Sequence, residues 1–301
     1  MVSATSIGFT AVSTVEAFVI IIGNMLTIFV FWTHKFHLKQ SYFPLINLAV
    51  ADLFFGVIEA IVLGSEKIPN LISEAKRKES SGVNPTRAFQ VLGFTTSVFF
   101  LALIALERAF ALLWPLRHRV TSTRAYVYSI VIVWAAGFSM AAISTILPTY
   151  HPRLREVSNI TVHSCLFISL LVICASYITI RNRLRTKKNG IDVHFQNARE
   201  QNIRLSRTLF TVVAASLVVW LAAFVVFSIT AFSRRRFPPY FVWSAHVLHL
   251  ANSTVNPFVY SSRMPIFKVA LKKLWIGRSV EKPLSYEPFL KIKKRDFNVI
   301  T

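Results

Sequence analysis

Asn256-Pro257-Phe258-Val259-Tyr260 ends the last long apolar segment of this chain, and a basic, amphipathic run follows it at once. A proline inside a membrane helix leaves a backbone carbonyl without its usual partner. It is tolerated only where neighbouring helices, side chains or water satisfy the freed groups. This stretch therefore predicts that the last apolar segment packs inside a bundle of helices.

The composition is that of a membrane protein. Of the 301 residues, 54% are hydrophobic and only 16% are charged, which is too apolar for a soluble domain of this size. A helix needs about 20 apolar residues to cross a bilayer core. Stretches of that length run over 11–33, 42–64, 87–109, 124–147, 162–181, 205–232 and 238–261. We therefore expect an all-α membrane protein, a seven-transmembrane helix bundle.

The segments divide the chain into four parts: a short extracellular N-terminus (1–10), a membrane domain (11–262), an interfacial amphipathic helix (263–276) and a basic cytoplasmic tail (277–301). The interfacial helix is predicted because Phe267, Ala270, Leu271 and Leu274 share one helical face, with lysines opposite. No cysteine follows this helix, so palmitoylation there is not expected.

The positive charges set the expected orientation. Of the 34 Lys and Arg residues, 24 fall on the side that holds the tail, and such residues are enriched on cytoplasmic surfaces. The N-terminus is therefore expected outside, in a multi-pass protein of the plasma membrane. The net charge of +21 would attract polyanions. Because the cytoplasmic excess explains most of it, anionic inner-leaflet lipid is the expected partner, and nucleic acid is not.

Polar residues inside the segments are costly and therefore mark functional candidates. One set lies near mid-depth: Asn24, Asp52, Ser97, Asn252, Ser253 and Asn256. A buried carboxylate such as Asp52 either takes up a proton or binds a cation, and these oxygen-rich neighbours suit a sodium ion with water. The other interpretation is a hydrogen-bonded polar core that holds helices together. The gathering of the set from four segments favours the ion site.

A second polar group stands at the end of the third segment, where Glu107 is followed directly by Arg108. An exposed pair of this kind contributes little to stability. Partly buried between helices, it can act as a switch that releases Arg108 when the helices part.

These motifs, in this order on these segments, resemble those of the rhodopsin-like (class A) G protein-coupled receptors. The resemblance covers about 11–275 and rests on Gly23-Asn24, the run Leu48 to Leu53, Glu107-Arg108 with Pro115, Trp134, Trp220, and Asn256-Pro257 with Tyr260. It implies a signalling receptor without enzymatic activity and without a cofactor, apart from an allosteric sodium ion.

The resemblance also implies roles for particular residues. Arg108, next to Glu107, would meet the C-terminal helix of a heterotrimeric G protein alpha subunit, and Leu116 would insert into the same protein. Tyr177 and Tyr260 would swing inward in the active state, and Trp220 would form the floor of the ligand cavity. The sodium pocket of the family would be Asp52, Ser97, Asn252, Ser253 and Asn256.

The chain also departs from the family pattern. Ala109 replaces a tyrosine, and no cysteine stands near 83–87 to form the usual extracellular disulfide. Ser169 and Ala222 occupy positions where the family has prolines in the fifth and sixth segments. Because proline is the commonest cause of a sharp helix kink, the pivot of the activation movement is expected to differ.

The ligand is less well defined. Amine receptors of the family have an aspartate where this chain has Gln90, and opsins need a lysine that 238–262 lacks. The chain is therefore expected to be neither. The outer loops carry a net positive charge, which predicts an anionic small molecule or a short acidic peptide. The expected cavity residues are Glu59, Arg87, Gln90, His163, Trp220, Trp243 and His246.

Asn159 begins a sequon in the loop expected outside and is a glycosylation candidate.

Two other functions remain open from the residues. The missing prolines would suit a receptor-like protein with impaired coupling. Acids within the segments, namely Glu16, Asp52 and Glu59, could relay protons in a seven-helix transporter. The absence of an inverted repeat counts against transport.

Overall fold

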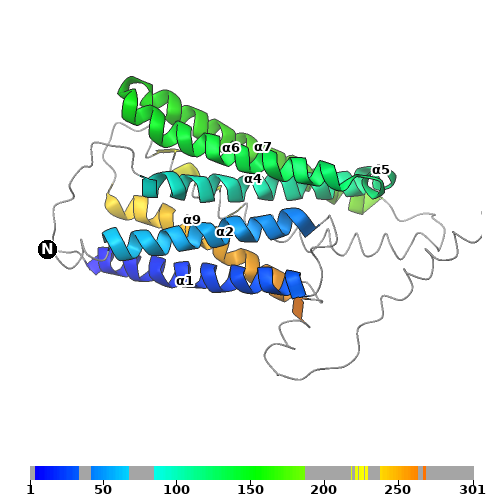
Figure 1. Ribbon diagram of the computed structural model, residues 1–301, viewed down its shortest axis with the longest axis horizontal. Helices are drawn as coiled ribbons and strands as arrows, with labels where there is room; N and C mark the ends of the chain where they lie inside the picture. Colours follow the sequence, from blue (N-terminus) through cyan, green and yellow to red (C-terminus); the bar gives the residue numbers. More distant parts are fainter. Residues whose placement is uncertain are drawn as a thin grey trace, which may run out of the picture.

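The computed structural model describes residues 4–33, 42–67, 85–186, 218, 221–222, 224–226, 228–229, 238–263 and 267–268. Throughout these residues the chain is helical or forms short connections, without a strand. Long helices lie side by side along one axis (Figure 1). The expected all-α bundle is confirmed for the part of the chain that these ranges cover.

The first half of the bundle consists of α1 (Ala4–Thr33), α2 (Phe43–Val62) with its π-helical extension η3 (Leu63–Lys67), and α4 (Pro85–Leu113). The second half consists of the short α5 (Pro115–Arg119), α6 (Thr123–Tyr150), the 3-10 turn η4 (Pro152–Leu154), α7 (Arg155–Thr186) and α9 (Pro239–Arg263). Among the described residues, five stretches are long and apolar enough to cross a membrane: Thr5–Thr33, Phe43–Ser65, Pro85–Leu113, Thr123–Tyr150 and Pro152–Arg183.

Helix α4 occupies the middle of the bundle. It packs against α2, α6 and α7, whereas α1 packs against α2 and α9 (Figure 1). Large apolar side chains such as Phe18, Ile132 and Ile168 are exposed on the outer helices. In a bilayer these side chains meet lipid, so the bundle keeps its polar side chains for the interior.

The stretch around Pro257 packs tightly against α1. A Cβ atom at Gly23 would lie 2.9 Å from Cγ of Pro257, so only glycine allows α1 to approach the proline-containing turn of α9 this closely. Asn256, Pro257 and Tyr260 are all buried. The prediction that this segment packs inside a bundle is therefore confirmed.

Two helices begin earlier than the apolar spans expected from the sequence. Helix α1 begins at Ala4, within the expected N-terminal tail 1–10, and α7 begins at Arg155 instead of near 162. An apolar run marks only the stretch that crosses the bilayer core, and both helices continue past it into more polar residues. The sixth segment (205–232) and the interfacial helix (263–276) are described only at scattered positions, and the tail (277–301) lies outside the described residues.

Candidate functional site

Helix α4 carries polar residues at three depths on one face. Gln90, Ser97 and Arg108 follow one another at intervals of seven and eleven residues. These intervals are close to two and three turns of an α-helix, so the three side chains project in nearly the same direction. Each belongs to a separate polar group. After the orientation expected from the sequence, we name these groups the outer cavity, the central cluster and the cytoplasmic network.

The central cluster is built around Asp52 of α2, which is fully buried. The hydroxyls of Ser97 and Ser253 each donate to its Oδ1 at 2.7 Å. The amide of Asn256 donates to its Oδ2, also at 2.7 Å. One carboxylate thus joins α2, α4 and α9 in the middle of the bundle. Asn24 joins α1 to the same region, because its amide donates to the carbonyl of Ser253 at 3.5 Å and to that of Ile20 at 2.9 Å.

Several buried oxygens near this carboxylate have no hydrogen-bond partner among the described residues. They are Oδ1 of Asn24, Oδ1 of Asn252, Oδ1 of Asn256 and the hydroxyl of Tyr260. Buried polar groups are normally satisfied, and an ion or water is the usual reason where protein partners are lacking. A carboxylate with surplus amide and hydroxyl oxygens is the donor set that hard cations prefer. Of the sequence-predicted sodium residues, Ser97, Ser253 and Asn256 bond directly to Asp52, and Asn252 precedes Ser253 on α9. Oxygen donors of this kind suit a hard cation.

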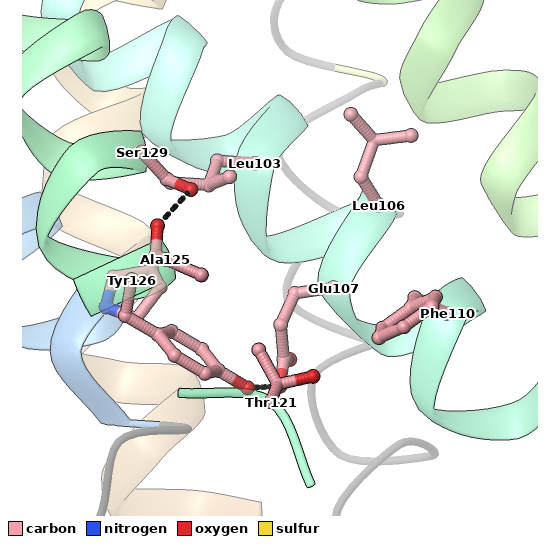
Figure 2. A pocket seen from close by; sticks show the side chains of 9 residues that line it. Leu103, Leu106, Glu107, Phe110, Thr121, Ala125, Tyr126 and Ser129 are labelled. Atoms are coloured by element: carbon pink, nitrogen blue, oxygen red, sulfur yellow. Dashed lines mark hydrogen bonds between the residues drawn. The ribbon is translucent and has the colours of Figure 1, made fainter. Parts of the chain in front are cut away.

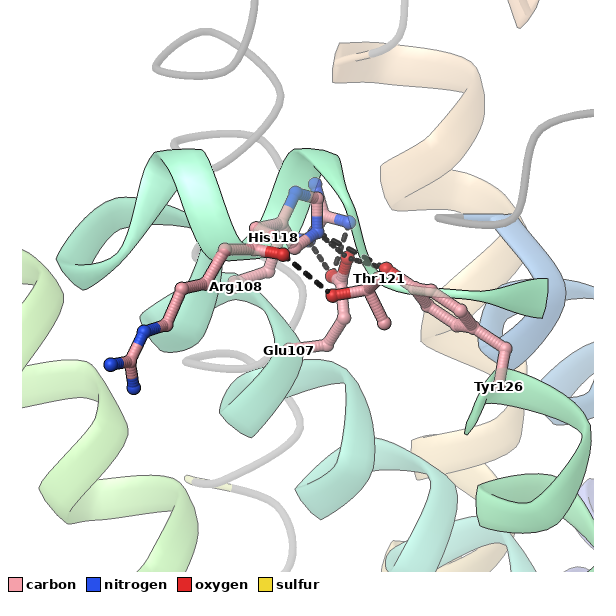
Figure 3. A network of polar contacts seen from close by, with 6 residues as sticks. Glu107, Arg108, His118, Thr121 and Tyr126 are labelled. Carbon is pink, nitrogen blue, oxygen red and sulfur yellow. Dashed lines mark hydrogen bonds and ion pairs between the residues drawn. The ribbon is translucent and has the colours of Figure 1, made fainter. Parts of the chain in front are cut away.

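The cytoplasmic network is built around Glu107 of α4 (Figure 3). Its carboxylate pairs with the guanidinium of Arg108, which is only 3% exposed. Its Oε1 lies 2.8 Å from Nε2 of His118 on α5, and the hydroxyl of Tyr126 on α6 donates to it at 3.2 Å. His118 and Tyr126 also contact each other at 3.1 Å. Glu107 thus holds α4, α5 and α6 together.

Other residues expected in the coupling surface lie near this network or on neighbouring helices. Leu116 is on α5 and is 73% exposed. Tyr177 is half-buried on α7. The ring of Tyr260 packs against Phe31 and Phe267, with centroids 6.1 and 6.4 Å away. Trp220 lies outside the described residues. The sequence analysis did not assign His118 or Tyr126 to this network. The available signal was the place of His118, three residues after Pro115 in the short segment that follows α4.

The outer cavity has a volume of about 410 Å³. Its polar lining includes Arg87, Gln90, Asn159, His163, His246 and His249. Its apolar lining includes Phe55, Val91, Phe94, Val162, Leu166 and Phe224. Four of the predicted cavity residues are thus brought together here. His249, Phe55 and Phe94 were missed, and they form one aromatic group with centroid distances of 4.9 and 4.0 Å from the imidazole ring.

Glu59 is not among the lining residues, but it bonds to two residues of the cavity wall. It is fully buried. The amide of Gln90 donates to its Oε2 at 2.8 Å, and Nε2 of His246 lies 2.8 Å from its Oε1. The carboxylate therefore joins α2, α4 and α9 at this depth, as Asp52 does lower in the bundle. Trp243 does not line this cavity, because its ring contacts Phe9 of α1 with centroids 5.6 Å apart.

The expected loop position of Asn159 is wrong. The residue lies in α7, where its carbonyl bonds to His163 Nδ1 at 2.7 Å, and it lines the outer cavity. The helix starts early because Glu156 in its first turn interacts favourably with the positive end of the helix dipole. A half-buried asparagine on a cavity wall is a poor acceptor for a glycan.

Comparison with known proteins identifies the class. Residues 23–260 match the model of the seven-transmembrane receptor (rhodopsin) family, so the chain belongs to that family. It is thus a multi-pass membrane receptor and not an enzyme. Similar proteins include lysophosphatidic acid receptor 3 of Homo sapiens, 24% identical over 88% of this chain and 80% of the relative. Sphingosine 1-phosphate receptor 1 of Danio rerio is 26% identical (80% and 71%), and histamine H2 receptor of Cavia porcellus is 25% identical (84% and 75%).

Proposed function

We propose that this receptor binds an extracellular ligand in the outer cavity and activates heterotrimeric G proteins at its cytoplasmic face. The observation that supports this most is the polar face of α4. Gln90, Ser97 and Arg108 each join a different polar group, so a small movement of one helix acts on all three groups at once.

Ligand binding would be coupled to G protein activation because the ligand makes different contacts in the resting and the active state. A ligand that contacts Gln90 or His246 competes with their bonds to Glu59 and so changes how α4 and α9 pack. A ligand shifts a conformational equilibrium only by its difference in affinity for the two states. In the state described here, Arg108 is held by Glu107. Release of that pair would let Arg108 meet the G protein.

We further propose that sodium binds at Asp52 and favours the resting state. The carboxylate, with Ser97, Ser253 and the amide oxygens of Asn252 and Asn256, would hold the ion. A bound cation would neutralise the buried carboxylate, which is costly to leave charged in a low-dielectric interior. The ion would also tie α2, α4 and α9 more firmly together.

The cavity favours an anionic amphiphile as the ligand. Arg87 and three histidines supply positive charge or hydrogen-bond donors, and the remaining wall is largely aromatic and aliphatic. Two relatives are named for lysophosphatidic acid and sphingosine 1-phosphate, which carry phosphate on an apolar chain. A histamine receptor is similar at the same level, 25% against 24% and 26%, so the choice of ligand rests on the cavity and not on the identities. An amine needs a carboxylate, and that of Glu59 already bonds to Gln90 and His246.

The plasma membrane, with the N-terminus outside, is the proposed setting. Arg117, Arg119, Arg124, Arg181 and Arg183 are exposed where α4 and α7 end and α6 begins, which is one end of the bundle. Positive residues gather on the cytoplasmic side of membrane proteins. The opposite end, with the cavity, would then face outside.

The proposal is tested by nucleotide exchange on a panel of purified G proteins with the receptor in membranes. Lysophosphatidic acid and sphingosine 1-phosphate serve as probes, and exchange is also measured without ligand. Arg108→Ala should abolish exchange on every G protein that the wild type activates, whereas Arg183→Ala, on an exposed residue outside the network, should not. Exchange that survives Arg108→Ala unchanged would contradict the proposal.

A further inference from the structure

A second cavity lies at the end of the bundle that carries the Glu107 network (Figure 2). Its volume is about 210 Å³. It lies between α4 and α6 and is lined by Pro44, Leu103, Leu106, Glu107, Phe110, Thr121, Ala125, Tyr126 and Ser129. We call this cavity the α4–α6 pocket.

The polar side chains of the α4–α6 pocket are already bonded within the protein. Ser129 donates to the carbonyl of Ala125 at 2.8 Å, and Thr121 donates to the carbonyl of Arg117 at 3.0 Å. The Glu107 carboxylate bonds to its three partners in the cytoplasmic network. With these donors already used, the walls offer a polar occupant few new hydrogen bonds, and a buried polar group left unsatisfied is costly. A hydrocarbon chain fits these walls without that cost.

The surroundings of the pocket give such a chain a way in. Leu106, on the pocket wall, is 50% exposed. On α6, Ala125 of the pocket wall is exposed, and so is Ile132, one turn beyond Ser129. Because α6 is apolar and long enough to span a membrane, these side chains contact lipid tails in a bilayer. The pocket therefore lies beside the hydrocarbon.

The charges around the pocket select among lipids. Arg117 and Arg119 on α5 and Arg124 on α6 are exposed, and they flank Thr121 and Ala125 of the pocket wall in the chain. Arginine forms strong, often bidentate bonds with phosphate. The carboxylate of Glu107 would repel a phosphate from the interior, so a headgroup is held at the rim while its chain points inward.

We propose that the α4–α6 pocket binds one acyl chain of an acidic glycerophospholipid from the cytoplasmic leaflet. The headgroup lies against Arg117, Arg119 and Arg124. This inference rests on the proposed orientation and not on the proposed ligand or G protein coupling. Because Glu107 and Tyr126 form part of the wall, the bound chain braces the cytoplasmic network from its membrane side.

The first test is native mass spectrometry of the purified full-length receptor in detergent, titrated with phosphatidylserine or phosphatidylcholine. The wild type should bind phosphatidylserine several-fold more tightly. Ala125→Phe places a ring in the pocket and should remove the tight binding. Val127→Phe makes the same change two positions away, outside the lining, and should bind as the wild type does. If Ala125→Phe fails to fold, Ser129→Leu fills the same space.

The second test distinguishes binding of the headgroup at the rim arginines from nonspecific attraction between positive residues and an anionic lipid. Arg117→Ala/Arg124→Ala should weaken phosphatidylserine binding by roughly fivefold per arginine, the factor expected for a basic residue near an anionic lipid surface. Arg181→Ala/Arg183→Ala removes two exposed arginines from the same end of the bundle and should have little effect. Glycerophosphoserine, which has the headgroup without chains, should not compete.

Three results would overturn the proposal. Unchanged binding in the folded pocket-filling variants would mean that the chain lies elsewhere. Equal weakening in the two arginine variants would mean diffuse attraction only. Competition by glycerophosphoserine would mean a phosphate site without a role for the acyl chain. None of these results depends on whether the receptor activates a G protein.

Discussion

Two carboxylates organise the interior of this receptor, and they are built in different ways. Asp52 is fully buried and accepts three hydrogen bonds, while oxygens around it have no partner among the described residues. Glu107 is 9% exposed and is held by Arg108, His118 and Tyr126. The first carboxylate has acceptor oxygens to spare, whereas the second has a positive or donor partner on every side.

The difference indicates what each carboxylate can do. The proposed sodium ion would use the unpartnered oxygens around Asp52, so it would bind there without breaking a hydrogen bond within the protein. The Glu107 network can change only if one of its bonds breaks, which suits a switch near the protein surface. We therefore expect changes at the central cluster to affect mainly stability, and changes at the cytoplasmic network to affect mainly basal signalling.

The largest expected effect is the loss of stability in Asp52→Ala. The substitution leaves the donors of Ser97, Ser253 and Asn256 without their acceptor. Each buried donor left unsatisfied costs about 1–3 kcal/mol, so the total should reach about 3 kcal/mol or more. Asp52→Asn keeps an acceptor oxygen and should lose less. Thermal unfolding in detergent measures both. Glu107→Ala should lose less than Asp52→Ala, and the reverse order would contradict the comparison.

The next largest effect is expected from overpacking at Gly23, where α1 packs against α9. Gly23→Val places atoms where Pro257 lies and pushes α9 away from α1. Overpacking of this kind typically costs about 1–3 kcal/mol. Gly8 lies on the same helix with nothing within 4 Å of its Cβ position, so Gly8→Val is the matched control. Thermal unfolding should separate the two variants clearly, and similar melting temperatures would show that the close approach is unimportant.

The central cluster was largely predictable from the sequence, and the cytoplasmic network was not. Asp52, Ser97 and Asn256 could be placed together because each is a polar residue at a similar depth in an apolar segment, and the membrane leaves few other partners. The partners of Glu107 come from a connection and the start of the next helix, where many polar residues compete and depth gives no guide.

The residues of the outer cavity were also only partly predictable from the sequence. Charged and amide residues such as Arg87, Gln90 and His246 could be nominated because polarity in an apolar segment is visible. Phe55 and Phe94 could not, since aromatic residues are common throughout this chain and only the packing of helices reveals which of them face a cavity. The start of α7 was also misjudged, because a polar first turn looks like a loop in the sequence.

A smaller effect is expected from sodium itself. Replacing choline chloride with sodium chloride at constant ionic strength should raise the melting temperature of the wild type. At ten times the dissociation constant, a ligand specific for the folded state adds about 1.4 kcal/mol. Asp52→Asn should show no such increase. An equal increase in that variant, or with potassium in place of sodium, would mean that the spare oxygens of the central cluster serve water and not this ion.

The smallest expected effect is at the edge of the cytoplasmic network. Tyr126→Phe removes the hydroxyl that donates to Glu107 at 3.2 Å and contacts His118 at 3.1 Å, and it leaves the ring in place. One such bond contributes about 1 kcal/mol. That energy changes the ratio between the state in which Glu107 holds Arg108 and the state in which the pair is released by roughly fivefold. Basal nucleotide exchange on the responsive G protein should rise by up to that factor, with little change in melting temperature.

Tyr128 on the same helix is 65% exposed, so Tyr128→Phe is the control and should leave exchange unchanged. A fall in basal exchange with Tyr126→Phe would mean that the hydroxyl supports the active state. In that case the hydrogen bond to Glu107 would not stabilise the resting state. Glu107 and Asp52 would then differ in burial and not in their role in switching. A rise confined to Tyr126→Phe would instead place the switch at this bond, because the two tyrosines differ in their contact with the carboxylate and share the same helix.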